Sequence, residues 1–280
     1  LFPANASDGT PIQSAMAVVD THTGAVLAMI GGRDYTTRRG LNRATQMRRQ
    51  PGSALKPLAV YGPALELGYT TASVLLDEKT SFGSYTPRNA GDRYYGLVTM
   101  RTAVRNSLNT TAVRLLEEIG MDASVNYLRK LGIPVQDNDR NLSLALGSMT
   151  YGVTPVELAA AYVPYANGGT FYSPHCINRI CSADGTVLYE RSEQGEQVMT
   201  AQNAYLMTSL LQSVITNGTG TRMLSANTPL AGKTGTVSMT GGNRDIWMAA
   251  YNSELSVAVW MGFDQTDASH KISNGITGGR

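Results

Sequence analysis

Strand-like segments at both ends of the chain limit the fold more than any other feature of the sequence. Two apolar runs lie near the start and three near the end, and within each group a short turn separates one run from the next. The runs are 15–20, 25–30, 233–239, 246–251 and 255–263. Between the two groups, apolar residues recur at helical spacing in these stretches: 53–67, 100–119, 123–131, 155–166 and 202–217. The simplest assembly is an α+β fold with a central antiparallel sheet built from both chain ends and helices on both faces.

Turn and cap residues define further elements. The first two runs are apolar on both faces, which predicts a hairpin buried between layers. Thr154 and Pro155 are typical of an N-cap and a first helical turn, and they place the start of the fourth helix. Residues 69–97 are predicted to be loop-like, and residues 171–190 are predicted to form a second hairpin around 183–185.

The composition is that of a globular protein. Of the 280 residues, 42% are hydrophobic and 16% are charged, and the net charge of +2 gives no basic patch for nucleic acid. We expect residues 1–13 to be a linker and 14–280 to be one domain. No apolar run approaches the roughly 18 residues that span a bilayer. Cys176 and Cys181 lie in a strand-like segment, where five residues span roughly 16 Å, which disfavours a disulfide between them.

The first chemical motif is Ser53-x-x-Lys56. Ser and Lys three residues apart share one face of a helix, and Pro51-Gly52 places Ser53 at the helix start, where free N–H groups favour negative charge. A serine hydroxyl is a poor nucleophile until a base takes its proton. Lys56 can act as that base if burial and a second cation lower its pKa. Taken alone, the motif is more often a solvated lysine on a surface helix.

The second motif is an S-x-N sequence, and it occurs twice. Ser107-Leu108-Asn109 opens a strongly helical stretch, whereas Ser225-Ala226-Asn227 lies a few residues before the last motif. We prefer Ser107, because a segment so close to the last motif in sequence cannot form an independent wall of a cleft. Ser107 is predicted to relay a proton, and Asn109 to hold a substrate carbonyl. Either residue alone is more simply explained as a helix cap.

The third motif, Lys233-Thr234-Gly235-Thr236, carries the strongest signal. Gly235 is predicted to let a substrate backbone lie along the strand. Thr234 and Thr236 supply hydroxyls and Lys233 supplies charge for a terminal carboxylate. The amides of Ser53 and Thr236 are predicted to form an oxyanion hole. Lys233 is also the second cation that the first motif requires. The simpler alternative is an amphipathic strand with a glycine bulge.

The three motifs in this order resemble the transpeptidase domain of class A penicillin-binding proteins. The resemblance runs from about Ala15 to the last residue. It extends to the segments around the motifs and between them: 42–45, 49–53, 109–114, 145–147, 154–159, 166–169, 218–221, 231–236, 245–247 and 259–262. In that family a glycosyltransferase domain and a membrane anchor precede this domain, and a helix follows it. These parts are absent from this sequence, so we expect contact with the membrane only through an anchor outside it.

The resemblance implies a DD-transpeptidase that works on the outer side of the bacterial cytoplasmic membrane, in the periplasm or at the cell surface. Ser53 would attack the D-Ala-D-Ala bond of a peptidoglycan stem peptide, and an amine on a neighbouring stem would resolve the acyl-enzyme. The partners would be donor and acceptor stem peptides, with β-lactams as covalent inhibitors. The family needs no cofactor and no metal.

Three related functions use the same motifs. A serine β-lactamase commonly places a Glu on a loop between the second and third motifs, but between Glu118 and Glu157 the only acidic residues are Asp122, Asp137 and Asp139. A DD-carboxypeptidase would differ only in using water as the acceptor. A non-enzymatic β-lactam sensor would need Ser53 and Lys56 but would not turn over a peptide. The sequence favours the transpeptidase and leaves these alternatives open.

Overall fold

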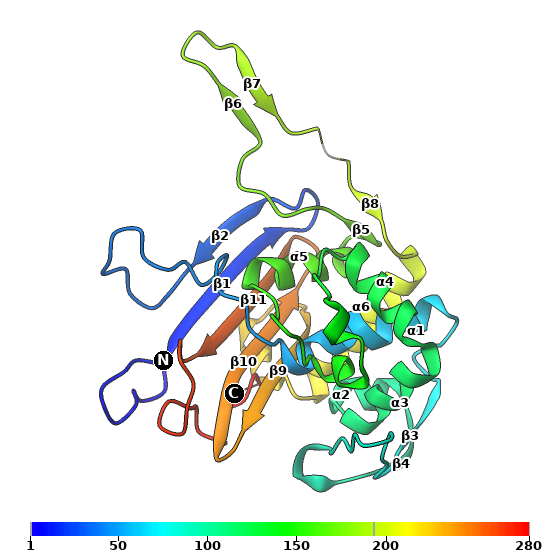
Figure 1. The fold of residues 1–280 in the computed structure, drawn as a ribbon. Coiled ribbons are helices and arrows are strands. Elements are labelled where there is room, and N and C mark those ends of the chain that lie inside the picture. Colours follow the sequence, from blue (N-terminus) through cyan, green and yellow to red (C-terminus); the bar gives the residue numbers. More distant parts are fainter. Residues whose placement is uncertain (1, 193, 280) are drawn as a thin grey trace.

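The computed structural model describes residues 2–192 and 194–279, and its centre is a five-stranded antiparallel sheet (Figure 1). The strand order is β2-β1-β11-β10-β9. The sheet strands are β1 (Gln13–Asp20), β2 (Val26–Ile30), β9 (Ala231–Met239), β10 (Gly242–Tyr251) and β11 (Leu255–Gly262). Because β1 pairs with β11, the first and last parts of the chain share one sheet. This confirms the predicted α+β fold with a sheet from both chain ends.

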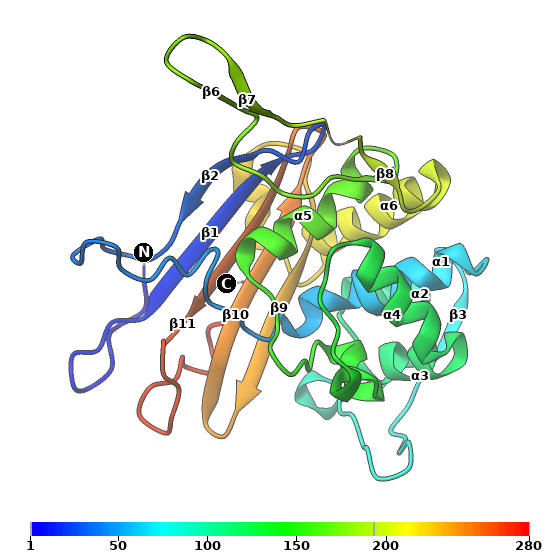
Figure 2. The same ribbon diagram turned by 45° about the horizontal axis from the view of Figure 1, so that its top comes forward.

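Small residues on one face of the sheet let helices approach closely. Ala17, Ala258 and Ala249 lie side by side in register, and all three are fully buried. Helix α5 (Pro155–Ala166) packs there, and Ser256 Oγ donates to the Ala159 carbonyl at 2.7 Å. The neighbouring α6 (Ala201–Asn217) contacts β9 on the same face (Figure 2). We predicted helices on both faces, and among the described residues the α-helices that contact the sheet lie on this one.

The first hairpin is not buried between layers, so that prediction was wrong. Strand β1 is an inner strand and alternates between buried and half-buried positions, but β2 is an edge strand. Leu27 is 57% exposed and Ile30 is 51% exposed. Hydrophobic composition alone cannot tell an edge strand from a central one, because burial depends on the position of the strand in the sheet.

Two predicted helices are interrupted where the chemical motifs lie. The stretch 53–67 forms a 3-10 turn η1 (Gly52–Leu55), a π-helical turn η2 (Pro57–Tyr61) and helix α1 (Gly62–Glu66). Pro57 and Pro63 lack an N–H to donate, which disrupts regular α-helical bonding there. The stretch 100–119 divides into α2 (Met100–Arg105) and α3 (Asn109–Ile119).

The remaining elements are short. Helix α4 (Met121–Lys130) follows α3, and the 3-10 turns are η3 (Ala90–Asp92), η4 (Asp137–Asp139), η5 (Leu142–Leu146) and η6 (Thr221–Ala226). The paired short strands are β3 (Val74–Asp77) with β4 (Gly96–Thr99), β5 (Thr170–Phe171) with β8 (Glu196–Gln197), and β6 (Arg179–Cys181) with β7 (Val187–Glu190). No helix of the described part is long and apolar enough to cross a membrane.

The predicted second hairpin is present in a shorter form. Strands β6 and β7 pair and project from the body of the molecule, as both ribbon views show (Figures 1 and 2). Phe171, at the start of the predicted span, pairs instead with Glu196 of β8. Cys176 and Cys181 lie on this projection as free, exposed thiols.

Candidate active site

Ser53 lies where a helical turn meets the edge of the sheet. It belongs to η1, which packs on strand β9, and it follows Gly52, whose φ of +56° lies in the left-handed region. A Cβ on Gly52 would lie 2.9 Å from the Thr236 carbonyl oxygen, so only glycine fits this approach. The two backbones are therefore in direct contact, and Ser53 is fixed against the outer strand.

Gly235, on strand β9, also allows the close contact between η1 and the strand. A Cβ there would lie 2.3 Å from the Pro51 carbonyl oxygen and 3.1 Å from the Ala54 Cβ. The sequence analysis assigned this glycine to the passage of a substrate backbone. In the structure its missing side chain makes room for η1, which brings Ser53 to the strand.

Ser107 reaches the site because the chain breaks between two helices. Its φ of +55° is in the left-handed region, which is rare for a serine and ends α2 sharply. The break turns its hydroxyl toward two amines. Lys233 Nζ donates to Ser107 Oγ at 2.8 Å, and Lys56 Nζ lies 3.3 Å from the same oxygen. Ser107 thus connects the lysines of the first and third motifs.

Lys56 is fully buried, its backbone N–H donates to the Ser53 carbonyl, and its amine is surrounded by acceptors of the second motif. Its Nζ donates to the carbonyls of Ser107 at 2.7 Å and Leu108 at 3.0 Å, and to Asn109 Oδ1 at 2.6 Å. Ser53 Oγ makes no hydrogen bond to any described residue. Unliganded sites often lack the catalytic hydrogen bond, which forms when substrate binds.

Burial sets the proton affinity of both lysines. Loss of solvation holds the pKa of Lys56 well below its usual value, and the charge of Lys233 lowers it further, while Asp77 opposes the shift. Burial alone lowers the pKa of Lys233 to about 7. The pKa of Lys56 is thus shifted in the direction that a general base requires.

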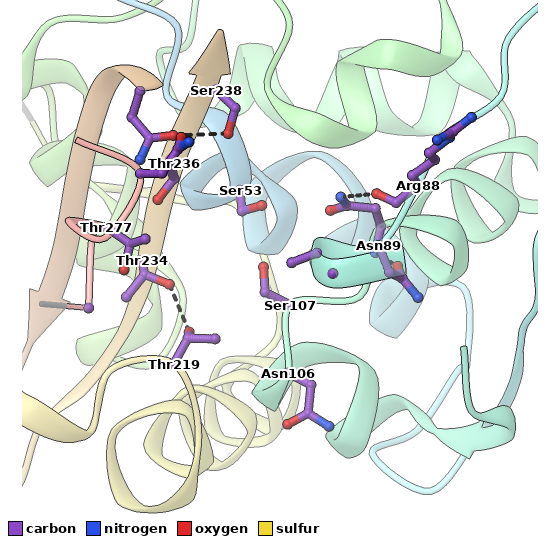
Figure 3. A pocket seen from close by; sticks show the side chains of 16 residues that line it. Ser53, Arg88, Asn89, Asn106, Ser107, Thr219, Thr234, Thr236, Ser238 and Thr277 are labelled. Carbon is purple, nitrogen blue, oxygen red and sulfur yellow. Dashed lines mark hydrogen bonds between the residues drawn. The ribbon is translucent and has the colours of Figure 1, made fainter. Parts of the chain in front are cut away.

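A cavity of about 600 Å³ opens beside Ser53. Figure 3 shows Ser53 and Ser107 pointing into it, with Thr234 and Thr236 on the strand opposite. Thr219 faces Thr234, and their hydroxyl oxygens lie 2.7 Å apart. The cavity wall is rich in hydroxyl and amide groups, which suits a polar, peptide-like ligand.

A second hollow of about 260 Å³ meets the first at Ser53. It is lined by Gln50, Gly147 and Ser148 together with residues of β9. Among the residues that the structure describes, neither hollow is lined by a carboxylate side chain. In the same part of the chain, no three His, Cys, Asp or Glu side chains gather where they could hold a metal ion.

The structure brings together all of the residues that the motifs singled out. Ser53 and Ser107 line the cavity, and the fully buried Lys56 and Lys233 have their amines within hydrogen-bond distance of Ser107 Oγ. Asn109, Thr234 and Thr236 line the cavity as well, and Gly235 packs against η1. The competing Ser225 is exposed in η6, and its hydroxyl donates to the Arg222 carbonyl, outside the lining of either hollow.

Sequence reasoning missed several residues that support this site. Asp77 is fully buried next to the start of α3, and Asn89 is 6% exposed beside it. Thr219 faces the third motif, and Gln50 accepts the Trp247 indole N–H at its carbonyl, at 2.9 Å. Asp77 and Asn89 fall in the span that was predicted only as loop. A polar pair before a helix is too common a pattern to have identified them.

The fold and the site together define a class of protein. A Ser-x-x-Lys turn beside an edge strand that carries Lys-Thr-Gly occurs in penicillin-binding proteins and in serine β-lactamases. Within that class, the chain belongs to the penicillin-binding protein transpeptidase family. The model of the "Penicillin binding protein transpeptidase domain" matches residues 14–277.

Known relatives agree with this assignment. The chain is 43% identical to penicillin-binding protein 1F of Bacillus subtilis over 94% of its own length and 37% of that protein. It resembles the crystal structure of penicillin-binding protein 1A from Haemophilus influenzae with a TM-score of 0.84 at 26% identity, over 97% of this chain and 46% of that one. It also resembles PonA1 of Mycobacterium tuberculosis in complex with penicillin V, with a TM-score of 0.82 at 27% identity, over 96% and 74% of the two chains. The chain thus spans much less than two thirds of its curated relative.

Proposed function

We propose that this domain is a DD-transpeptidase that cross-links peptidoglycan stem peptides through an acyl-enzyme on Ser53. One observation carries the proposal. Ser53 lines a polar cavity one helical turn before a buried amine of lowered pKa, Lys56, and Ser107 connects that amine to Lys233. This arrangement supplies a nucleophile, a base and a proton path within one site.

The acylation step follows from these positions. Neutral Lys56 takes the proton of Ser53, and Oγ attacks the carbonyl carbon of the penultimate D-Ala. The amides of Ser53 and Thr236 are proposed to stabilise the oxyanion. The tetrahedral intermediate collapses, the C–N bond breaks, and the departing D-Ala nitrogen receives a proton through Ser107. An ester between Ser53 and the donor peptide remains.

The second half-reaction runs the same path in reverse. The amine of an acceptor stem attacks the ester carbonyl and passes a proton back to the lysine–serine relay. Ser53 leaves with a proton, and a new amide bond joins the two stems. We propose that Thr234 and Thr236 bind the terminal carboxylate of the donor, that the buried Lys233 supplies positive charge for it, and that Asn109 holds a donor carbonyl. β-Lactams would acylate Ser53 by the same attack on their ring carbonyl.

The absence of a carboxylate beside Ser53 favours a transferase over a β-lactamase. Rapid hydrolysis needs a base that activates water on the acyl-enzyme, and neither hollow at Ser53 is lined by Asp or Glu among the described residues. Asp139, which lies in the relevant stretch of sequence, is buried and accepts from Thr150 N and Oγ1. A long-lived acyl-enzyme is therefore expected. A carboxypeptidase and a β-lactam sensor share this feature and remain as alternative functions.

The domain limits and the location belong to the same proposal. Residues 14–280 would form the penicillin-binding domain, with 1–13 as its linker. Cross-linking of stem peptides takes place outside the cytoplasmic membrane, so the domain would work there, in the periplasm or at the cell surface.

Labelling with a fluorescent penicillin tests the nucleophile. We expect a stable covalent label on the wild-type chain and none on Ser53→Ala. Ser225→Ala is a matched control, because it removes the serine of the competing S-x-N sequence outside the cleft. Absence of label on a folded wild-type chain would refute the proposed mechanism.

A stem-peptide assay then separates the alternatives. The domain is incubated with a D-Ala-D-Ala donor, with and without an acceptor amine, and both D-Ala release and the cross-linked product are measured. Product formation supports the transpeptidase. Release of D-Ala without product indicates a carboxypeptidase, label without turnover of donor indicates a sensor, and rapid loss of the penicillin label indicates a β-lactamase.

A further inference from the structure

The helix that carries the second motif has no cap of its own. Leu108 precedes α3, and its side chain cannot accept a hydrogen bond from the helix start. Asn89, in the segment between β3 and β4, takes that role from a distance. Its Oδ1 accepts from Asn109 N at 2.7 Å and from Thr110 N at 3.3 Å. Two N–H groups at the start of the helix are thus satisfied by one residue that lies 20 positions earlier.

Asn89 is itself held by a buried acid. Its Nδ2 donates to Asp77 Oδ1 at 2.7 Å and to the Arg93 carbonyl at 2.9 Å. Asp77 also accepts from the Thr110 hydroxyl, and its Oδ2 accepts from Tyr95 N at 3.0 Å. Asp77 is fully buried, so each of these donors compensates for its lost hydration. The amide of Asn89 therefore has one available orientation, with its oxygen toward α3.

This network determines where Asn109 points. The backbone N–H of Asn109 is bound to Asn89, and its side-chain Nδ2 donates to the Arg88 carbonyl at 2.7 Å. Its Oδ1 then faces Lys56 Nζ at 2.6 Å. Residues 88 and 89 thus hold Asn109 at two points, and the third contact of Asn109 is with the Lys56 amine.

We propose that Asn89, oriented by Asp77, is a positioning residue that sets the geometry of the second motif for acylation of Ser53. The inference rests on the proposed function, because it concerns how that same site is assembled. Asn89 acts through Asn109 and through the turn at Ser107, which the start of α3 fixes in place. The charged groups that act on Lys56 are Lys233 from β9 and Asp77 from β3, so the acid also contributes a counter-charge to the buried amines.

The first test is the variant Asn89→Ala. Two quantities are measured for it: the acylation rate constant at saturating fluorescent penicillin, and the apparent dissociation constant of the penicillin. A reacting group misplaced by about 1 Å costs on the order of 100-fold in rate, so we expect a loss of about 10- to 100-fold in the rate constant. The dissociation constant should change much less. Thr99→Ala is the matched control, because it removes the cap of the neighbouring α2, where Thr99 Oγ1 accepts from Thr102 N at 3.2 Å. The control should acylate like the wild type.

A second variant, Asn89→Asp, keeps the oxygen that accepts from the start of α3 and replaces the Nδ2 group that donates to Asp77 with a second carboxyl oxygen. Two adjacent carboxyl groups cannot both ionise easily, so at low pH they share a proton that restores the donated hydrogen bond. We expect the variant-to-wild-type ratio of acylation rate constants to be highest at pH 5 and to fall as pH rises. A purely structural role would give a ratio that does not depend on pH in this way.

The outcomes separate this inference from the proposed function. If the wild type is not labelled, the proposed function itself fails. If the wild type is labelled and folded Asn89→Ala acylates within twofold of it, or if Thr99→Ala loses as much, the positioning role is refuted. If Asn89→Ala does not fold, the pH trend of Asn89→Asp decides, and a flat ratio would overturn the inference.

Discussion

Replacing Lys233 with Met should flatten the dependence of stability on pH. Burial lowers the pKa of Lys233 to about 7 in the folded domain, whereas the unfolded chain keeps the ordinary value of 10.5. Below pH 7 both states hold the proton. Between pH 7 and 10.5 only the unfolded state holds it, so unfolding takes up a proton and becomes less favourable as pH rises. The lowered pKa therefore makes the free energy of unfolding rise with pH across this window.

The size of the effect follows from the shift. One proton of linkage changes the free energy of unfolding by about 1.4 kcal/mol per pH unit. At pH 7 half of the folded molecules still hold the proton, so between pH 7 and 9 the wild type should gain about 2 kcal/mol from Lys233 alone. Lys233→Met removes this pH-dependent contribution to the free energy of unfolding. It also removes the hydrogen bonds to Ser107 Oγ and the Thr234 carbonyl, but that loss shifts the whole curve and leaves its slope unchanged.

Urea unfolding at several pH values measures the difference. We expect the slope of the free energy of unfolding against pH to be smaller in Lys233→Met, by nearly the contribution of one proton. The slope that remains comes from Lys56 and from the rest of the chain. Lys130→Met, which removes an exposed amine from the end of α4, controls for the change in net charge. Equal slopes in the wild type and in Lys233→Met would mean that the buried amine keeps its proton in the fold, and the reasoning would be wrong.

Three further substitutions test the argument from burial and close packing. Asp245→Ala removes a fully buried carboxylate that pairs with two arginines and accepts from Trp260 Nε1 at 2.9 Å, and it should cost about 3–5 kcal/mol in thermal unfolding. Asp122→Ala breaks an exposed ion pair and should cost under about 1 kcal/mol, so equal losses would contradict the argument from burial. Gly235→Ala places a Cβ 2.3 Å from the Pro51 carbonyl oxygen, which pushes η1 away from the strand. Penicillin labelling of this variant should slow by about 100-fold, and a rate equal to wild type would refute the close-packing explanation.

The sequence predicted which motifs meet, but not how the chain brings them together. Strand-like ends and a helical middle were enough to place Lys233 on a sheet that both termini share. The break at Ser107 was not visible, because apolar spacing continues through it and its left-handed φ depends on tertiary contacts. One of those contacts comes from Asn89, in a segment without periodicity. The exposure of Leu27 was missed for a similar reason, since edge position is a property of the assembled sheet.

The two walls of the cleft differ in how they are held, and this has a consequence for their stability. Ser53 and the strand opposite are joined by backbone contact at Gly52 and Gly235, where no side chain intervenes and little movement is possible. The wall that carries Ser107 is held instead by side-chain hydrogen bonds from Lys56, Lys233 and Asn89. Two of these three side chains, Lys56 and Lys233, are amines whose charge depends on pH. The second wall is therefore the part of the site whose position should respond first to protonation, while the nucleophile stays fixed.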